Sequence, residues 1–148
     1  MIISIDQSLT CTGVCLMMKC GQYHTLCIKP GKLRGVERLE FIKEMLENKI
    51  LGLFGKITNG TIEGYSYGSV GRTFELGELG GMIKMLFKEY KISFEVIPPT
   101  VWKKTIVGKG NANKSTVRWK VEKQYGHVFK TQDECDAWCM AEHVRRKL

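Results

Sequence analysis

The sequence lacks the features of a membrane or exported protein. No apolar run approaches the roughly 20 residues that a helix needs to cross a bilayer, so we expect no membrane partner. The N-terminus has no basic segment, and Asp6 interrupts its first apolar residues, so it resembles neither a signal peptide nor a transit peptide. There is also no internal repeat, low-complexity tract or long linker. These absences favour one domain over residues 1–148 and a cytoplasmic location.

The six cysteines do not follow the spacing of a structural zinc site, since no C-x-x-C pair is present. Four lie along expected strands and two are one helical turn apart: Cys11, Cys15, Cys20 and Cys27, then Cys135 and Cys139. Without an export signal, reduced thiols are a better interpretation than a disulfide framework. We expect four of the six to act as small core hydrophobes.

Acidic residues are outnumbered by basic ones. The chain has 23 Lys and Arg against 15 Asp and Glu, a net charge of +8. This excess favours a polyanionic partner, because each neutralised phosphate releases condensed counterions. The alternative is a basic surface that serves solubility alone.

Hydrophobic periodicity predicts five strands and four helices. The expected strands are 2–7, 14–19, 23–28, 61–65 and 93–97, and the expected helices are 36–53, 74–90, 114–125 and 133–146. Pro98-Pro99 ends the last strand, and residues 108–113 read as a loop. Three consecutive strands followed by alternating helices and strands predict an α/β fold. We expect a five-stranded mixed sheet, its first three strands antiparallel, with helices on both faces.

Two carboxylates occupy the ends of expected strands. Asp6 follows a run of isoleucines, where a buried charge costs several kcal/mol unless a partner, proton or metal compensates. It could instead cap the next turn through Ser8 and Thr10. Glu63 lies toward the carboxyl end of a short strand, and ligands of open α/β sheets gather beyond the carboxyl ends of strands. Alone, Glu63 could equally occupy a sheet edge.

Asp133 and Asp136 are three residues apart at the start of the last expected helix, so they share a face. Acids are also common there for helix-dipole reasons alone. However, the stripe formed by positions 133, 136, 137, 140 and 144 resembles an inward face, and Glu134, Glu142, Arg145 and Arg146 lie mostly elsewhere. We therefore expect both aspartates to face the core beside Asp6 and Glu63.

Four clustered carboxylates predict a divalent metal site. Such groups repel one another and hold protons unless cations neutralise them, and hard divalent ions prefer oxygen ligands. Two ions ~4 Å apart can activate a water and stabilise the leaving oxygen of a phosphodiester. The four acids therefore suggest two-metal phosphodiester hydrolysis.

The order of the motifs resembles that of the RuvC-type Holliday junction resolvases, in the ribonuclease H-like superfamily. The matching segments are Ile5-Asp6-Gln7-Ser8-Leu9-Thr10-Cys11-Thr12-Gly13, Ile62-Glu63 with following aromatics, Leu76-Gly77-Glu78-Leu79-Gly80-Gly81, the basic segment 101–108 with Gly110 and Lys114-Ser115, and Asp133-Glu134-Cys135-Asp136-Ala137. Gln7 replaces a proline usual in bacterial members, and Tyr65 or Tyr67 replaces a phenylalanine that probes the junction. The short chain and its many cysteines look more like a phage-borne branch, which would act in the host cytoplasm.

The resemblance implies a single RuvC-like nuclease domain with a ribonuclease H-like fold. It implies a homodimeric endonuclease of DNA recombination and repair that makes paired nicks across a four-way junction, using two Mg²⁺ (or Mn²⁺) ions. The metal ligands carry over onto Asp6, Glu63, Asp133 and Asp136. Lys103 and Lys114 match family lysines near the active site, and we assign Lys114 a catalytic role in stabilising transition-state charge. The glycine-bearing helix 74–90 is the expected dimer element, with ordinary core packing as the alternative.

Basic and aromatic residues near the acids are the candidate DNA contacts. The cations are Lys103, Lys104, Lys109, Lys114 and Arg118, and the aromatics are Tyr65 and Tyr67. Cations could hold phosphates and tyrosines could stack on splayed bases. For Lys109, Arg118 and Lys120 a solvated face is the preferred interpretation, and a core position is an equal alternative for either tyrosine. Other functions compatible with the same residues are a broader nuclease that cuts flaps, forks or RNA–DNA hybrids, and a catalytically inactive DNA-binding protein of the same fold.

Overall fold

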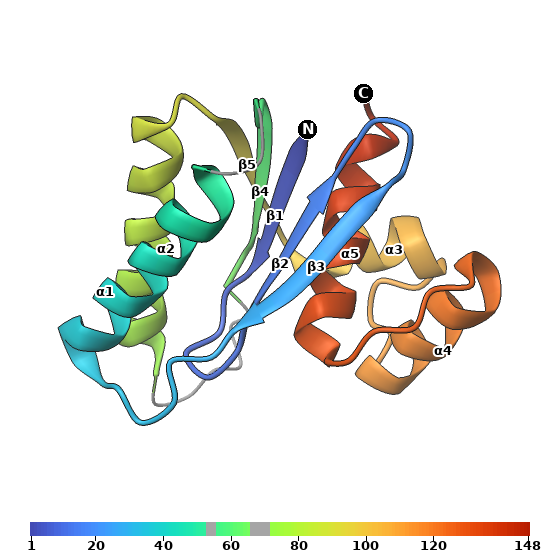
Figure 1. Cartoon of the computed structure of the whole chain (residues 1–148). Helices are drawn as coiled ribbons and strands as arrows, with labels where there is room; N and C mark the ends of the chain where they lie inside the picture. The colour runs from blue at the N-terminus through green and yellow to red at the C-terminus, as the bar shows by residue number, and fades with distance from the viewer. Residues whose placement is uncertain (53–55, 66–71) are drawn as a thin grey trace.

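The computed structural model describes residues 1–52, 56–65 and 72–148, and Figure 1 shows a sheet between two layers of helices. The strands are β1 (Ile2–Asp6), β2 (Thr12–Met17), β3 (Tyr23–Ile28), β4 (Asn59–Glu63) and β5 (Ser93–Ile97). The helices are α1 (Gly35–Leu46), the π-helical turn η1 (Glu47–Leu51), α2 (Thr73–Glu89), α3 (Pro99–Val107), α4 (Lys114–Tyr125) and α5 (Gln132–Arg145). In the described parts of the chain, no helix is long and apolar enough to cross a membrane.

The strands form a mixed sheet in the order β3-β2-β1-β4-β5. β1 pairs antiparallel with β2, and β2 with β3, whereas β1, β4 and β5 run parallel. The central strand β1 is buried throughout, as its continuous apolar run predicted. The expected five-stranded mixed sheet with three antiparallel strands is therefore confirmed.

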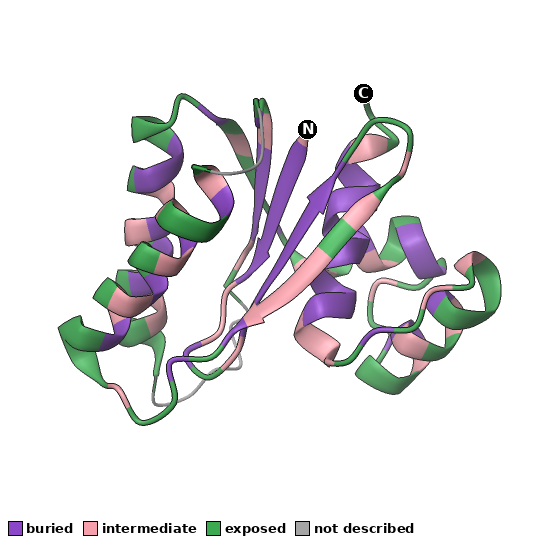
Figure 2. Ribbon diagram, viewed as in Figure 1, coloured by how far each residue is buried: buried purple, intermediate pink, exposed green. Residues whose placement is uncertain are grey.

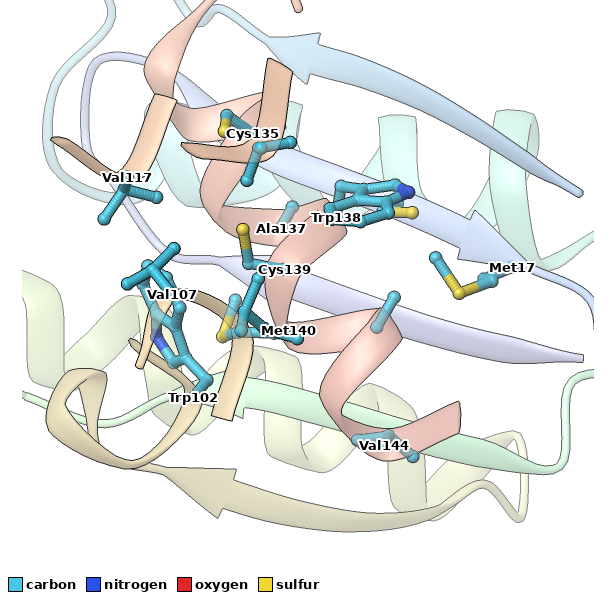
Figure 3. Close-up of a cluster of buried hydrophobic side chains, with 14 of the residues drawn as sticks. Met17, Trp102, Val107, Val117, Cys135, Ala137, Trp138, Cys139, Met140 and Val144 are labelled. Atoms are coloured by element: carbon cyan, nitrogen blue, oxygen red, sulfur yellow. The ribbon is translucent and has the colours of Figure 1, made fainter. Parts of the chain in front are cut away.

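Alternation along β1 divides the interior into two cores, one on each face of the sheet. Ile3 and Ile5 pack in the core that α1 and α2 cover, whereas Ile2 faces the core around α5. Figure 2 shows the buried strands β1 and β2 between helices whose outer faces are exposed, whereas the edge strand β3 is only partly buried. Figure 3 shows the second core, where Met17, Trp102 and Val107 surround side chains of α5. Helices on both faces are thus confirmed.

The helix α5 is buried on almost every side, which the sequence did not indicate. It packs on β1 and β2 and is covered by α3 and α4. Glu134 and Glu142, expected to lie mostly on another, outward face, are only 6% and 5% exposed. Their charges are compensated locally: Glu134 forms a capping box with Thr131, and Glu142 pairs with two arginines of the same segment. The expectation of a one-sided helix was therefore wrong.

Two further departures concern helix boundaries. The helix α3 begins directly at Pro99, in a segment where the sequence predicted only the end of a strand. Proline suits the first turn of a helix because its missing N–H is unpaired there anyway. The helix expected over 36–53 ends at Leu46 and continues as the turn η1 to Leu51. Residue 53 lies outside the described residues.

The cysteines also differ from expectation. Cys11 and Cys27 are joined as a disulfide, with their Cα atoms 5.6 Å apart. The hairpin explains this proximity, since β2 and β3 pair Gly13 with Cys27, two residues beyond Cys11. Three of the other four, Cys15, Cys135 and Cys139, are buried as expected of small hydrophobes, whereas Cys20 is exposed. The prediction that all thiols are reduced was therefore wrong for one pair.

Candidate active site

Two of the predicted acids meet at the ends of neighbouring parallel strands. Asp6 is the last residue of β1 and Glu63 the last of β4, and the register pairs Ile5 with Ile62 directly before them. Both isoleucines pack in the core beneath α1 and α2, so the acids project toward the opposite face, where α5 lies. The carboxyl groups of Asp6 and Glu63 lie close enough to shift each other's pKa.

The first turn of α5 brings the other two acids to the same place. Gly13 of β2 pairs with Asp6, and a Cβ atom at Gly13 would lie 2.2 Å from the carbonyl oxygen of Asp133. The backbone of α5 therefore rests directly on β2, which needs glycine there. This close approach puts Asp133 and Asp136 within electrostatic range of Asp6.

Burial and mutual repulsion raise the affinity of this cluster for protons. Burial raises the pKa of Asp6 well above its ordinary value, and the charges of Glu63, Asp136 and Asp133 raise it further. Burial also raises the pKa of Asp136 to about 7, against the lowering effect of its hydrogen bond from Gln132. The pKa of Glu63 is raised by burial too, and its hydrogen bond from Trp102 opposes that shift. A cation would remove this repulsion.

Three neighbouring side chains orient the acids. The indole Nε1 of Trp102 donates to Oε1 of Glu63 at 3.1 Å, and Nε2 of Gln132 donates to Oδ1 of Asp136 at 2.8 Å. Gln7 donates from its amide to the backbone carbonyl of Glu63 at 2.9 Å. Sequence reasoning missed these supports. The i, i+4 spacing of Gln132 and Asp136 was a readable signal, whereas Trp102 looked like an ordinary core residue.

The four acids form an open set rather than a closed cage. Within residues 1–52, 56–65 and 72–148, the one group of three His, Cys, Asp or Glu ligand atoms that all lie within 4.8 Å of one another is Cys11, Cys27 and Asp133. The oxygen donor set of the four acids suits a hard divalent ion.

The predicted lysines divide into two groups. Lys103 and Lys114 lie beside the cluster, where their charges lower the pKa values of Glu63 and Asp136. Lys103 also lies over the ring of Trp102, with Nζ 5.4 Å from the centroid. Lys104 and Lys109 are exposed on and just after α3.

Arg118 has a partner within the molecule, because its guanidinium donates to the carbonyl of Phe129 in the segment that leads into α5. This bond ties α4 to the approach of the acid-bearing helix. A phosphate contact from Arg118 stays a prediction.

Tyr65 lies between the end of β4 and α2. It is 42% exposed, and Nζ of Lys84 is 5.6 Å from its ring centroid. A Cβ atom at Gly80 would lie 2.3 Å from the Tyr65 hydroxyl, so this glycine permits the contact. Tyr67 lies outside the described residues.

Comparison with known proteins agrees with the resemblance read from the motifs. No family model matches the chain. The crossover junction endodeoxyribonuclease RuvC of Chloroherpeton thalassium is 33% identical over 98 residues, or 65% of this chain and 52% of that protein. The alignment thus spans about half the length of the curated relative.

Two solved structures share the fold. They are RuvC of Thermus thermophilus and the same protein in complex with a Holliday junction substrate, each with a TM-score of 0.77 and 18% sequence identity. Each covers 99% of this chain, which covers 94% and 95% of the two structures. The chain therefore shares the fold of RuvC, and the resemblance to RuvC is confirmed.

Proposed function

We propose that this RuvC-like chain is a metal-dependent endonuclease that resolves four-way DNA junctions by paired nicks. The observation that carries the proposal is the meeting of four acids, from β1, β4 and α5, at the carboxyl ends of two parallel strands. This arrangement occurs in a fold shared with a protein whose structure was solved with a Holliday junction. The sequence relative carries the name crossover junction endodeoxyribonuclease.

We infer that the site takes a pair of Mg²⁺ ions, for which Mn²⁺ could substitute, because its donors are carboxylate oxygens. Asp6, Glu63, Asp133 and Asp136 would hold the metal, and burial and like charge raise the pKa values of Asp6 and Asp136 until a cation compensates. When bound, such ions activate a water and stabilise the leaving oxygen. Trp102 and Gln132 hold two of the carboxylates in orientation. Lys114 would stabilise negative charge that develops on the phosphate.

Cations around the site would hold the DNA backbone. Lys103 and Lys114 already act electrostatically on the acids, and Lys104 and Lys109 are exposed nearby in sequence. These residues, with Arg118, supply register on the phosphates but no sequence information. Tyr65, and Tyr67 by its place in the sequence, would stack on bases at the junction.

The exposed face of α2 supports a homodimer. Phe74 and Met85 are 92% and 63% exposed, and Gly77 and Gly81 between them face open space. Helical spacing places all four on one side of α2, and exposed apolar residues with a glycine gap suit close packing of a second copy. Two copies would present two active sites, as paired nicks require.

Substitution of Asp6 by Asn tests the function directly. We expect loss of cleavage with retained binding, because the substitution removes one anionic metal ligand and leaves the phosphate-binding lysines unchanged. The assay offers four-way junction, flap, fork, RNA–DNA hybrid and linear duplex side by side with Mg²⁺. Glu44→Gln, an exposed acid on α1 across the sheet, is the matched control and should cleave normally.

The substrate panel separates the proposal from its alternatives. Symmetric nicks confined to the junction support resolution, whereas equal cutting of flaps or hybrids supports a broader nuclease. Binding without cleavage by the unmodified protein, with either Mg²⁺ or Mn²⁺, supports the inactive DNA-binding alternative. Normal cleavage by the Asp6→Asn variant contradicts the metal-site assignment.

A further inference from the structure

A second group of ligand atoms adjoins the carboxylate cluster. The sulfur atoms of Cys11 and Cys27 and a carboxylate oxygen of Asp133 all lie within 4.8 Å of one another. Cys11 precedes β2, Cys27 lies in β3, and Asp133 begins α5. Asp133 therefore belongs to two groups at once: the oxygen-rich cluster around Asp6 and a group that contains two sulfurs.

The fold builds this group at one point of the molecule. Pairing of β2 with β3 puts Cys27 beside Gly13, where the first turn of α5 rests on the sheet. Sγ of Cys27 is 3.0 Å from Oγ1 of Thr131, the residue that caps α5. The sulfurs thus lie against the same helix start that positions Asp133.

We propose that Cys11 and Cys27, when reduced, bind a soft divalent cation such as Zn²⁺ or Cd²⁺ together with Asp133. Thiolates favour borderline-soft and soft metals, and three protein ligands with a water in the fourth position are an established zinc arrangement. The hard ions expected at the carboxylate cluster prefer oxygen and would not select the sulfurs. The two sites are therefore distinct in chemistry although they share one ligand.

The disulfide and the metal exclude each other. Sulfurs bonded to one another carry no thiolate charge, so the oxidised pair offers no strong ligand. A water-soluble trialkylphosphine converts one state into the other: phosphorus is oxidised and takes the oxygen of a water molecule, the S–S bond breaks, and each sulfur gains one proton. Metal binding then releases both thiol protons.

The shared ligand links this site to cleavage, a consequence that rests on the proposed function. A zinc ion held by Cys11, Cys27 and Asp133 draws this carboxylate away from the cluster at Asp6. Cleavage by the reduced protein should therefore stop on zinc binding, and the oxidised protein should be insensitive to equimolar zinc.

Cadmium binding to the full chain tests the site without reference to cleavage. The phosphine-reduced protein is titrated with Cd²⁺, and the thiolate-to-metal charge-transfer absorption is recorded. We expect saturation at one equivalent and no such absorption from the oxidised protein. Cys27→Ser should weaken binding at least tenfold, and Cys11→Ser should do the same through the other sulfur. Cys20→Ser removes an exposed, unpaired thiol and should change nothing.

Two results would overturn the proposal: a reduced protein without the absorption band, or a Cys27→Ser variant that keeps both band and affinity. Asp133→Asn should weaken Cd²⁺ binding and preserve the band, whereas Asp136→Asn should leave both unchanged. Equal affinities of these two aspartate variants would contradict the assignment of Asp133. Because the band is independent of DNA, failure of the cleavage proposal alone leaves it intact.

Discussion

At the scale of single residues, one indole decides how a carboxylate of the site is presented. Trp102 is fully buried and donates to Glu63 at 3.1 Å. Trp138 is also buried, yet its Nε1 has no hydrogen-bond partner among the described residues. Both tryptophans are therefore buried, but they differ in whether the indole N–H acts on the site.

Trp102 and Trp138 can be compared by the same substitution. Trp102→Phe and Trp138→Phe should each lower the free energy of unfolding by about 0.5–3 kcal/mol through lost packing. Trp102→Phe alone should reduce cleavage roughly 10- to 100-fold and raise the Mg²⁺ concentration needed for half-maximal rate, because Glu63 loses its orienting donor. Junction cleavage against Mg²⁺ concentration measures both effects. An equal loss of activity in the two variants would contradict a positioning role for Trp102.

The raised pKa of Asp136 predicts the pH dependence of stability without metal. Its pKa rises from an ordinary 3.8 to about 7 on folding, so the folded state binds more protons than the unfolded state between these values. The contribution of Asp136 to the free energy of unfolding should therefore be highest below about pH 4. It should fall as the pH rises to about 7. Thermal unfolding in a chelator across this range measures it.

Two controls isolate that contribution. Asp136→Asn should flatten the decline in stability between pH 4 and pH 7, since the amide does not titrate. Mg²⁺ should stabilise the unmodified protein more at pH 8 than at pH 5, because the metal competes with protons for the same oxygens. The burial argument would be contradicted if the stability of the metal-free protein rose between pH 4 and pH 7 and Asp136→Asn removed that rise.

At the scale of elements, the sequence predicted strands and helices that have regular hydrophobic periodicity. It did not predict features that depend on neighbouring elements. The strands β3 and β5 and the helix α4 have the bounds that alternation and helical spacing predicted. The sequence did not predict α3, because a proline that ends a strand can equally begin a helix, as Pro99 does. The burial of Glu134 and Glu142 depends on the layer that α3 and α4 add over α5, which no local pattern contains.

In the candidate site, too, the sequence predicted what depends on local patterns and missed what depends on the fold. Asp6 and Glu63 were predictable from strand ends, and Asp133 with Asp136 from helix spacing, because each is a local signal. The contact of Gly13 with Asp133 and the pairing of Cys11 with Cys27 depend on strand register and on the docking of α5. Residues far apart in sequence meet there, so their proximity required the fold.

The exposed face of α2 yields an element-scale prediction. Phe74→Glu should weaken self-association about tenfold or more, since a charge would then be buried between two helices. Sedimentation velocity over a concentration series measures the shift toward monomer. Val128→Glu changes a residue that is 75% exposed on the other side of the sheet and should leave association unchanged. An unaltered dimer in Phe74→Glu would exclude this face as the interface.

At the scale of the whole molecule, the charge distribution predicts how DNA binding responds to salt. The net charge is +8, and junction affinity should fall linearly on a log–log plot against salt concentration. Lys104→Ala should lower the magnitude of the slope by about 0.9, the value for one lost phosphate contact. Lys43→Ala, on α1 across the sheet, is the control and should preserve the slope. A flat salt response of the unmodified protein would contradict binding through phosphates.

The docking of α5 on Gly13 also has a consequence during synthesis of the chain. Asp6 emerges from the ribosome long before Asp133 and Asp136, and no stretch that ends before residue 133 contains the complete set of acids. The contact between β2 and α5 joins residues about 120 positions apart (Gly13 and Asp133), and such distant pairings form late in folding. The four acids of the proposed metal site can therefore come together only after residue 136 has left the ribosome.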